Sequence, residues 1–444
     1  MKSSSLTILL IGLMVFLAES GCLFPEKKFP GNELPFQKTV EIRQVGKNYQ
    51  LYRHGKPYYI RGAGGDEYFG ELAANGGNSV RTWSTYQLKE ILDRADSNGL
   101  TVLAGLDLWP ERLGMNYNDA QMVADQKERI RKDVLTYKDH PALLMWGIGN
   151  ELDLGYANED VWVAVNDIAA MIHEIDPNHP TTTMIMPNAR NTRLIAEKAP
   201  EIDILSFNVF GAAGKLNENL RKPWWGWKGP YIISEWGGLG WWERQTTQWH
   251  VPIDMPGTLK AQKLVEVYSA SMKEDTSWCL GSYLFFWGNK QERTHTWFSF
   301  FTEEGNPTPM VEAARYNWTG KWPDNRAPVI DSVKLNNRID SENIYLYQKQ
   351  QYSARVLASD PEGQKLTYKW EIRAEGLYIK ITGGDKEERP QPLPGLIQSV
   401  NDGVMSFTAP EQPGPYRIFV YISDPGKTTT IADIPFFVTH SEID

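Results

Sequence analysis

The stretch LLMWGIGNE at residues 143–151 is the most informative part of this sequence. Its first six residues form an apolar run without alternation, which is typical of a strand covered on both faces, as in a parallel sheet. The run leads into a polar pair, Asn150 and Glu151. Polar side chains that follow a buried parallel strand lie at the carboxyl end of the sheet, where α/β folds bind their ligands. The stretch therefore indicates an α/β fold with a candidate site at this strand end.

Seven further apolar runs are similar in length and character, and amphipathic stretches with helical periodicity lie between them. From Tyr58 to Gly281 the repeat is about 32 residues per strand and helix, close to the ~31 of a closed eightfold barrel. No glycine-rich phosphate-binding motif follows the first run, which disfavours an open doubly wound sheet. We therefore expect an α/β fold, a (β/α)8 TIM barrel over residues 41–322. The seven runs are 57–62, 79–83, 101–106, 181–186, 202–207, 231–234 and 281–287.

The pattern changes after Trp322. A linker at 323–328, PDNRAP, is followed by a region without helical periodicity. Alternating segments such as 352–356 and 416–420 are separated by turn sequences. Short strands at this spacing predict a small all-β domain, an immunoglobulin-like sandwich, at 329–444.

The N-terminal segment has the features of a leader. The apolar run at 6–18 is short for a membrane span but suits a signal peptide. Small residues lead into Cys22, as in a bacterial lipobox, although Glu19 stands where leucine is usual. We expect a lipoprotein-type signal peptide at 1–21, a lipid anchor on Cys22 and a tether at 22–40, which predicts an outer-membrane or cell-surface lipoprotein. Ordinary signal cleavage, giving a secreted or periplasmic protein, is the alternative.

Two glutamates follow the fourth and seventh runs. Glu151 ends the stretch 143–151, and Glu235 directly follows 231–234. These strands lie on opposite sides of an eight-stranded mouth, so the two carboxylates can face each other. Retaining cleavage of a glycosidic bond needs that arrangement: one carboxylate attacks and the other, about 5–5.5 Å away, protonates the leaving oxygen. We therefore predict that Glu151 and Glu235 are catalytic.

The Asn-Glu pair after run four and the glutamate after run seven resemble glycoside hydrolase clan A, with a barrel of the family-two type. The resemblance implies that Glu151 is the acid/base and Glu235 the nucleophile. It also implies that Arg81 orients the nucleophile and that Asn150 binds the sugar 2-hydroxyl. Many clan members place a Tyr or His near Asn208 that hydrogen-bonds the nucleophile. Either Asn208 substitutes for it, or another strand supplies this contact.

The chain has 17 tryptophans, of which seven lie between residues 224 and 249. Aromatic faces in loops at a barrel mouth can stack on the apolar C–H patches of sugar rings. The resemblance adds Trp287 as the platform beneath the reacting sugar. For each tryptophan the alternative is core packing. The tryptophans predicted to bind substrate are Trp83, Trp109, Trp236, Trp242 and Trp287.

The composition excludes several other functions. The net charge is −9 without a basic run, which argues against a nucleic-acid partner. The seven histidines and two cysteines show no metal-ligand spacing, so we expect neither metal nor cofactor. We expect a monomer whose partners are a polysaccharide and, through the anchor, a membrane.

The compact barrel with one trailing immunoglobulin-like domain is similar to bacterial endo-β-1,3-glucanases, which implies a laminarin-like β-glucan as substrate. β-Mannan, β-1,4-glucan and galactan remain open as substrates, and transfer of the glycosyl group to another sugar would use the same residues. A non-catalytic surface glycan-binding lipoprotein is the alternative from a different class. The two opposed glutamates speak against it, because a pure binder does not need them.

Overall fold

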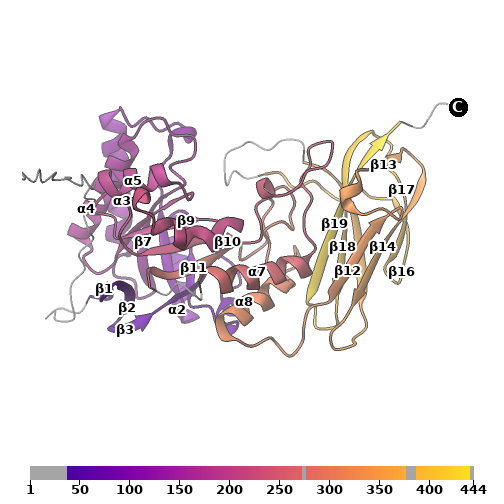
Figure 1. Cartoon of the computed structure of the whole chain (residues 1–444), viewed down its shortest axis with the longest axis horizontal. Coiled ribbons are helices and arrows are strands. Elements are labelled where there is room, and N and C mark those ends of the chain that lie inside the picture. The colour runs from indigo at the N-terminus through magenta and orange to yellow at the C-terminus, as the bar shows by residue number, and fades with distance from the viewer. Residues whose placement is uncertain (1–37, 273–276, 377–386, 441–444) are drawn as a thin grey trace, which may run out of the picture.

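The computed structural model describes residues 38–272, 277–376 and 387–440 (Figure 1). The predicted signal peptide, Cys22 and all but the last three residues of the predicted tether lie outside the described residues. Within the described ranges, no helix is both long enough and apolar enough to cross a membrane.

Eight parallel strands close into a barrel in the order β10-β11-β4-β5-β6-β7-β8-β9. The predicted (β/α)8 barrel is thereby confirmed, and each of the eight apolar runs overlaps one barrel strand. The first run, 57–62, is divided, because β3 (Lys56–Tyr58) belongs to another sheet. The barrel strands are β4 (Ile60–Gly64), β5 (Ser79–Arg81), β6 (Thr101–Leu106), β7 (Leu143–Asn150), β8 (Thr181–Ile185), β9 (Ile204–Asn208), β10 (Tyr231–Gly237) and β11 (Cys279–Phe285).

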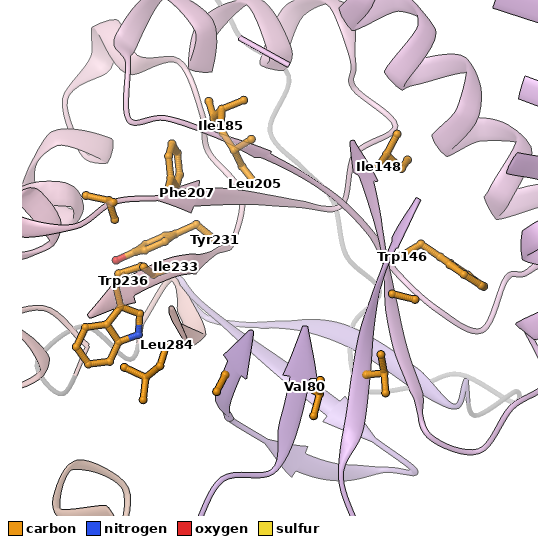
Figure 2. Packing of buried hydrophobic residues seen from close by; sticks show 14 of the residues in the cluster. Val80, Trp146, Ile148, Ile185, Leu205, Phe207, Tyr231, Ile233, Trp236 and Leu284 are labelled. Carbon is orange, nitrogen blue, oxygen red and sulfur yellow. The ribbon is translucent and has the colours of Figure 1, made fainter. Parts of the chain in front are cut away.

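Helices cover the outside of the barrel. Successive residues of a strand point to opposite faces, so about half of the side chains face these helices. Figure 2 shows Val80, Phe207 and Trp236 projecting outward from their strands, and all three are buried. The helices are α1 (Phe69–Ala74), α2 (Leu88–Ser97), α3 (Ala120–Tyr137), α4 (Asp160–Ile175), α5 (Ala189–Lys198), α6 (Leu216–Leu220), α7 (Gly257–Ser271) and α8 (Pro309–Thr319).

A small antiparallel sheet closes the amino-terminal end of the barrel. It contains β1 (Val40–Val45), β2 (Asn48–Arg53) and β3. The side chains of Ile42 and Leu51 are buried in one cluster with residues near the strand starts, such as Ile60 and Ile232. The sequence had not indicated this sheet. Because it covers one end, any site reached by a polymer lies at the other.

The C-terminal domain consists of two four-stranded sheets, which confirms the predicted all-β sandwich. Its core lies between the sheets. Figure 1 shows the sandwich beside the barrel, with α7 and α8 on the barrel side that faces it. One sheet has the order β12 (Val329–Leu335), β14 (Gln351–Ser359), β17 (Val404–Thr408) and β16 (Ile397–Asn401), and the other has the order β13 (Ile344–Tyr347), β19 (Thr429–Thr439), β18 (Gly414–Ser423) and β15 (Thr367–Ala374).

Candidate active site

Both predicted glutamates lie at the carboxyl end of the barrel. Glu235 lies within β10, and Glu151 directly follows β7. Glu151 has φ of +47°, a left-handed conformation that is uncommon outside glycine. Its peptide groups are held on both sides, since its N–H donates to the Met184 carbonyl (2.9 Å) and its own carbonyl accepts from Arg112 (2.5 Å). Strain held in place this way is typical of functional positions.

The Glu235 carboxylate is held by two donors on the same oxygen. Arg81 Nη1 donates to Oε1 at 2.9 Å, which is the contact that the sequence resemblance implied. The indole Nε1 of Trp83 donates to the same oxygen at 2.8 Å. The other oxygen, Oε2, accepts no hydrogen bond from the described residues, and Glu235 retains 6% exposure. One oxygen is therefore fixed while the other is available to react.

Arg81 joins the two halves of the site. Its side chain is fully buried, and Nη1 also donates to the Ser234 carbonyl at 2.6 Å. Nη2 donates to Asn150 Oδ1 at 2.7 Å. A planar guanidinium with several fixed donors can hold separate acceptors in a defined relative geometry. The position of Glu235 is thus tied to that of Asn150, the neighbour of Glu151.

Asn208 contacts the other glutamate. Its Nδ2 donates to Glu151 Oε1 at 2.9 Å and to Asn150 Oδ1 at 3.1 Å, while Ser234 Oγ donates to its Oδ1 at 2.8 Å. Of the two possibilities left open by the sequence, the second applies: the donor to Glu235 comes from another strand end, as Trp83. Trp83 had been predicted to bind sugar through its ring, and its indole N–H instead orients Glu235.

The charge of Glu151 affects the pKa of Glu235. Burial raises the pKa of Glu235 to about 7, the Arg81 charge opposes that rise, and the negative charge of Glu151 adds to it. The Trp83 hydrogen bond also favours the ionised form. Burial lowers the pKa of Arg81, and the Glu235 carboxylate works against this shift. Arg81 and Trp83 therefore both favour the ionised form of the buried Glu235 carboxyl.

A further carboxyl, Asp153, is buried next to this pair, and the sequence did not indicate it. It accepts hydrogen bonds from the Met186 N–H (3.2 Å) and from Asn191 Nδ2 (3.2 Å). Burial raises its pKa to about 7, and the charge of Glu151 adds to the shift. Its position in a loop after Glu151 carries no sequence signal, because loop carboxylates are common.

Aromatic rings run outward from Glu235 in a continuous series. Trp83 packs on Phe285 and Phe286 (centroids 5.8 and 5.9 Å), and Phe285 packs on Phe210 (5.9 Å). Phe210 meets the edge of Trp242 at 5.2 Å, and Trp242 packs on Trp241. Trp242 is 53% exposed. We call this series the aromatic wall; its members are Trp83, Phe210, Trp241, Trp242, Phe285 and Phe286.

Two predicted sugar-binding tryptophans are in fact core residues. Trp236 is fully buried and stacks on Tyr268 of α7, because it follows the inward-facing Glu235 and so points outward. Trp287 is 1% exposed, donates to the Tyr68 carbonyl and packs on Trp318 of α8. The strand ends two residues earlier, so it is Phe285, not Trp287, that joins the aromatic wall.

The remaining tryptophans divide between surface and core. Trp109 is 53% exposed at the rim beyond β6, where its backbone N–H is held by Gln126. Trp225 and Trp227 are buried, and Trp249 packs on Tyr345 of the sandwich. Sequence alone could not separate these groups, because all lie among similar Gly-rich and charged neighbours.

The site contains the elements of a double displacement. It has a carboxylate with one restrained oxygen and a second carboxyl held by a neutral amide, both at the open end of the barrel. Among the residues that the structure describes, no three His, Cys, Asp or Glu side chains lie together as a metal site would require.

Comparisons with known proteins find similarity over the barrel. Residues 40–240 match the family described as glycosyl hydrolases family 2, TIM barrel domain. The β-galactosidase of Thermoanaerobacter pseudethanolicus is 24% identical over 220 residues, which cover 45% of this chain and 26% of that protein. The human β-glucuronidase is 26% identical over 192 residues, covering 38% and 28%. This chain therefore aligns with only about a quarter of the length of these relatives.

The fold also matches solved structures. The β-glucuronidase of Bifidobacterium dentium superposes with a TM-score of 0.50 and 19% identity, over 65% of this chain and 50% of that one. At that identity the likeness concerns the fold alone. Residues 40–240 thus resemble the TIM barrel domain of the glycosyl hydrolases family 2, and the relatives named above are glycoside hydrolases.

Proposed function

We propose that this protein is a retaining glycoside hydrolase that cleaves a neutral β-linked polysaccharide, specifically as an endo-β-1,3-glucanase on laminarin-like glucan. The observation that carries the proposal is the state of the Glu235 carboxylate. Two donors hold Oε1 in place, and Oε2 is left without a partner among the described residues, at the same barrel mouth as Glu151.

In the first step, Glu235 Oε2 attacks the anomeric carbon as the glycosidic C–O bond breaks, and Glu151 gives its proton to the leaving oxygen. The product is a glycosyl ester on Glu235. In the second step, water attacks the same carbon, Glu151 takes the water proton, and the ester C–O bond breaks to regenerate the Glu235 carboxylate. Asn150 is fixed by Arg81 through Oδ1, and its amide nitrogen, which has no hydrogen-bond partner among the described residues, would bind the sugar 2-hydroxyl.

The charges around the mouth favour a neutral sugar. A uronic acid would need a cation to pair with its carboxylate. Arg81 is buried against Glu235, Lys290 pairs with Glu292, and Arg293 lies over the Trp241 ring at 4.0 Å. Each of these cations is already engaged. The aromatic wall beside them suits the apolar faces of glucose units.

A second candidate is an exo-acting β-galactosidase or β-glucuronidase. The similarity of the barrel to relatives with those names supports it. The engaged cations argue against the glucuronide, whereas a terminal galactose differs from glucose only in hydroxyl orientation and fits the same chemistry.

Product analysis on laminarin, mannan, barley glucan, cellulose and the aryl β-glucuronide and β-galactoside tests the proposal. We expect a ladder of oligosaccharides from laminarin. Release of monosaccharide alone from an aryl β-galactoside or β-glucuronide would support the second candidate, and binding without turnover of any glycan would favour a glycan-binding protein. Transfer is measured in the same assay with added acceptor sugar.

We also propose, from the sequence, that the protein is a lipoprotein anchored through Cys22. Mass spectrometry of the mature N-terminus tests this. A diacylated or triacylated Cys22 is the expected result, and an unmodified terminus at another residue would contradict it.

A further inference from the structure

We infer that the sandwich domain is part of the substrate-binding apparatus, because it holds the loop that positions Trp241 of the aromatic wall. Arg389 is the positioning residue in this connection. The inference extends the proposed function, and rests on it, in assigning Trp241 and Trp242 to the binding of a polymer. The connection passes through three sets of contacts, which follow one another outward from the barrel mouth.

The first contacts join Trp241 to the loop at 288–297, which follows β11. Trp241 Nε1 donates to Glu292 Oε1 at 3.3 Å. The Arg293 guanidinium lies over the Trp241 ring at 4.0 Å. An arginine stacked on an indole and a hydrogen bond on the indole edge together restrict both tilt and rotation of the ring. Trp241 is therefore oriented by this loop.

The second contacts join the loop to the segment 387–393 of the sandwich. The Arg293 N–H donates to Glu387 Oε2 at 2.8 Å. Arg389 Nη2 donates to Asn289 Oδ1 at 2.6 Å, and Arg389 Nη1 pairs with Glu303 at 3.2 Å. Asn289 in turn donates to the Phe301 carbonyl at 2.9 Å. Arg389 thus contacts the loop and the barrel segment beyond it at the same time.

The third contacts bury the base of the loop against β18. His295 is 3% exposed, its ring packs on Phe419 at 4.7 Å, and its Nε2 lies 2.5 Å from the Tyr421 hydroxyl. Tyr421 donates onward to Glu371 Oε2 at 3.2 Å. Burial lowers the pKa of His295 far below its ordinary value, so the ring is neutral there. The sandwich face is consequently shaped to receive this loop.

Independent binding modules on flexible linkers make few contacts with their enzyme. Here hydrogen bonds, ion pairs and a buried histidine cross between the two domains and lead directly to Trp241. Glucose units beyond the cleaved bond would stack on Trp241 and Trp242, while the sugar at Glu235 is bound by the barrel alone. Weakening the contact between the domains should therefore raise KM for long substrates and leave the turnover of short ones unchanged.

The test compares Arg389→Ala with Arg389→Lys in the full chain. The matched control is Lys349→Ala, which removes an exposed ion pair with Glu411 elsewhere on the sandwich. For Arg389→Ala we expect KM on laminarin to rise roughly three- to tenfold. We expect kcat on an aryl glycoside of a short laminari-oligosaccharide to stay unchanged. Arg389→Lys should recover part of the loss, and Lys349→Ala should match the wild type.

A readout that does not need turnover comes from 19F NMR of protein labelled with 5-fluorotryptophan. The Trp241 resonance is assigned by its disappearance in Trp241→Phe. We expect it to shift in Arg389→Ala and in Tyr421→Phe, and to stay in place in Lys349→Ala. An unmoved Trp241 resonance, or an unchanged KM on laminarin, would overturn the inference. If the resonance shifts but the wild type cleaves no β-glycan, the proposed function fails while the domain connection stands.

Discussion

The two ends of the barrel have opposite chemistry. At the amino-terminal end, Tyr49 and Leu51 of the small sheet are buried among apolar side chains. At the carboxyl end, Arg81, Glu235 and Asp153 are buried with charges that burial penalises. The closed end stabilises the fold, whereas the open end gives up stability to hold reactive groups in place. Substitutions at the closed end should therefore lower stability and leave activity unchanged. Substitutions at the open end should lower activity or raise stability.

The largest effect is expected at Glu235 itself. Glu235→Gln replaces the attacking carboxylate by a neutral amide, and kcat on laminarin should fall by about 10³-fold or more, while binding of oligosaccharide persists. Glu151→Gln should reduce kcat similarly for substrates with a poor leaving group and less for activated aryl glycosides, because those need little protonation. Steady-state kinetics measures both. The control is Glu71→Gln in the first turn of α1. Activity of Glu235→Gln near wild type would contradict the assignment.

At the closed end, Leu51→Ala should act on stability only. Leu51 is 1% exposed, and its truncation leaves a cavity that costs about 2–4 kcal/mol. Urea unfolding measures the loss, and kcat at a temperature where the variant is folded should equal that of the wild type. Val45→Ala is the control, since Val45 lies in the same sheet but is 48% exposed. A fall in kcat of folded Leu51→Ala would show that the two ends are coupled.

At the open end, Asp153→Asn should stabilise the protein. The folded pKa of Asp153 is raised to about 7 from an ordinary 3.8, so the folded state favours the protonated acid. This contribution is fully present below about pH 4 and is lost as the pH rises through 7. The neutral amide should therefore add about 2–4 kcal/mol at pH 8 and almost nothing at pH 4. Urea unfolding at both pH values measures it. Equal stability of the two proteins at pH 8 would contradict the assigned cost.

The smallest effect is expected for Trp83→Phe. The ring remains, but the N–H donor to Glu235 Oε1 is lost. Since that bond favours the ionised carboxylate, its loss should raise the pKa of Glu235 further. The acidic limb of kcat/KM should move to higher pH, and its maximum should fall about tenfold. A pH profile on the aryl oligosaccharide separates this from a packing defect, which would lower activity without moving the limb.

Much of the open end could be predicted from sequence. A polar residue that follows an apolar run necessarily lies at the barrel mouth, so the positions of Glu151, Glu235, Arg81 and Asn208 follow from strand order. Trp236 could also have been recognised as a core residue, because strand neighbours face opposite sides and Glu235 faces inward. Trp287 could not, since the strand ends before it and alternation stops there.

The closed end and the domain contact were not predictable in the same way. The strands β1, β2 and β3 are three to six residues long, and such short segments carry little periodicity of their own. The contact of Arg389 with Asn289 joins residues 100 positions apart, each polar and ordinary in its local sequence.

Strand order and the side of each strand that faces inward are local properties, repeated along the chain, and the sequence alone therefore supplies the barrel, the sandwich and the two glutamates at the mouth. Which atoms meet across the mouth depends on how the closed barrel brings distant strand ends together. Packing decides that Trp83 donates to Glu235, that Asn208 donates to Glu151, and that the sandwich contacts the loop that holds Trp241. Each of these contacts joins side chains that no local sequence pattern relates.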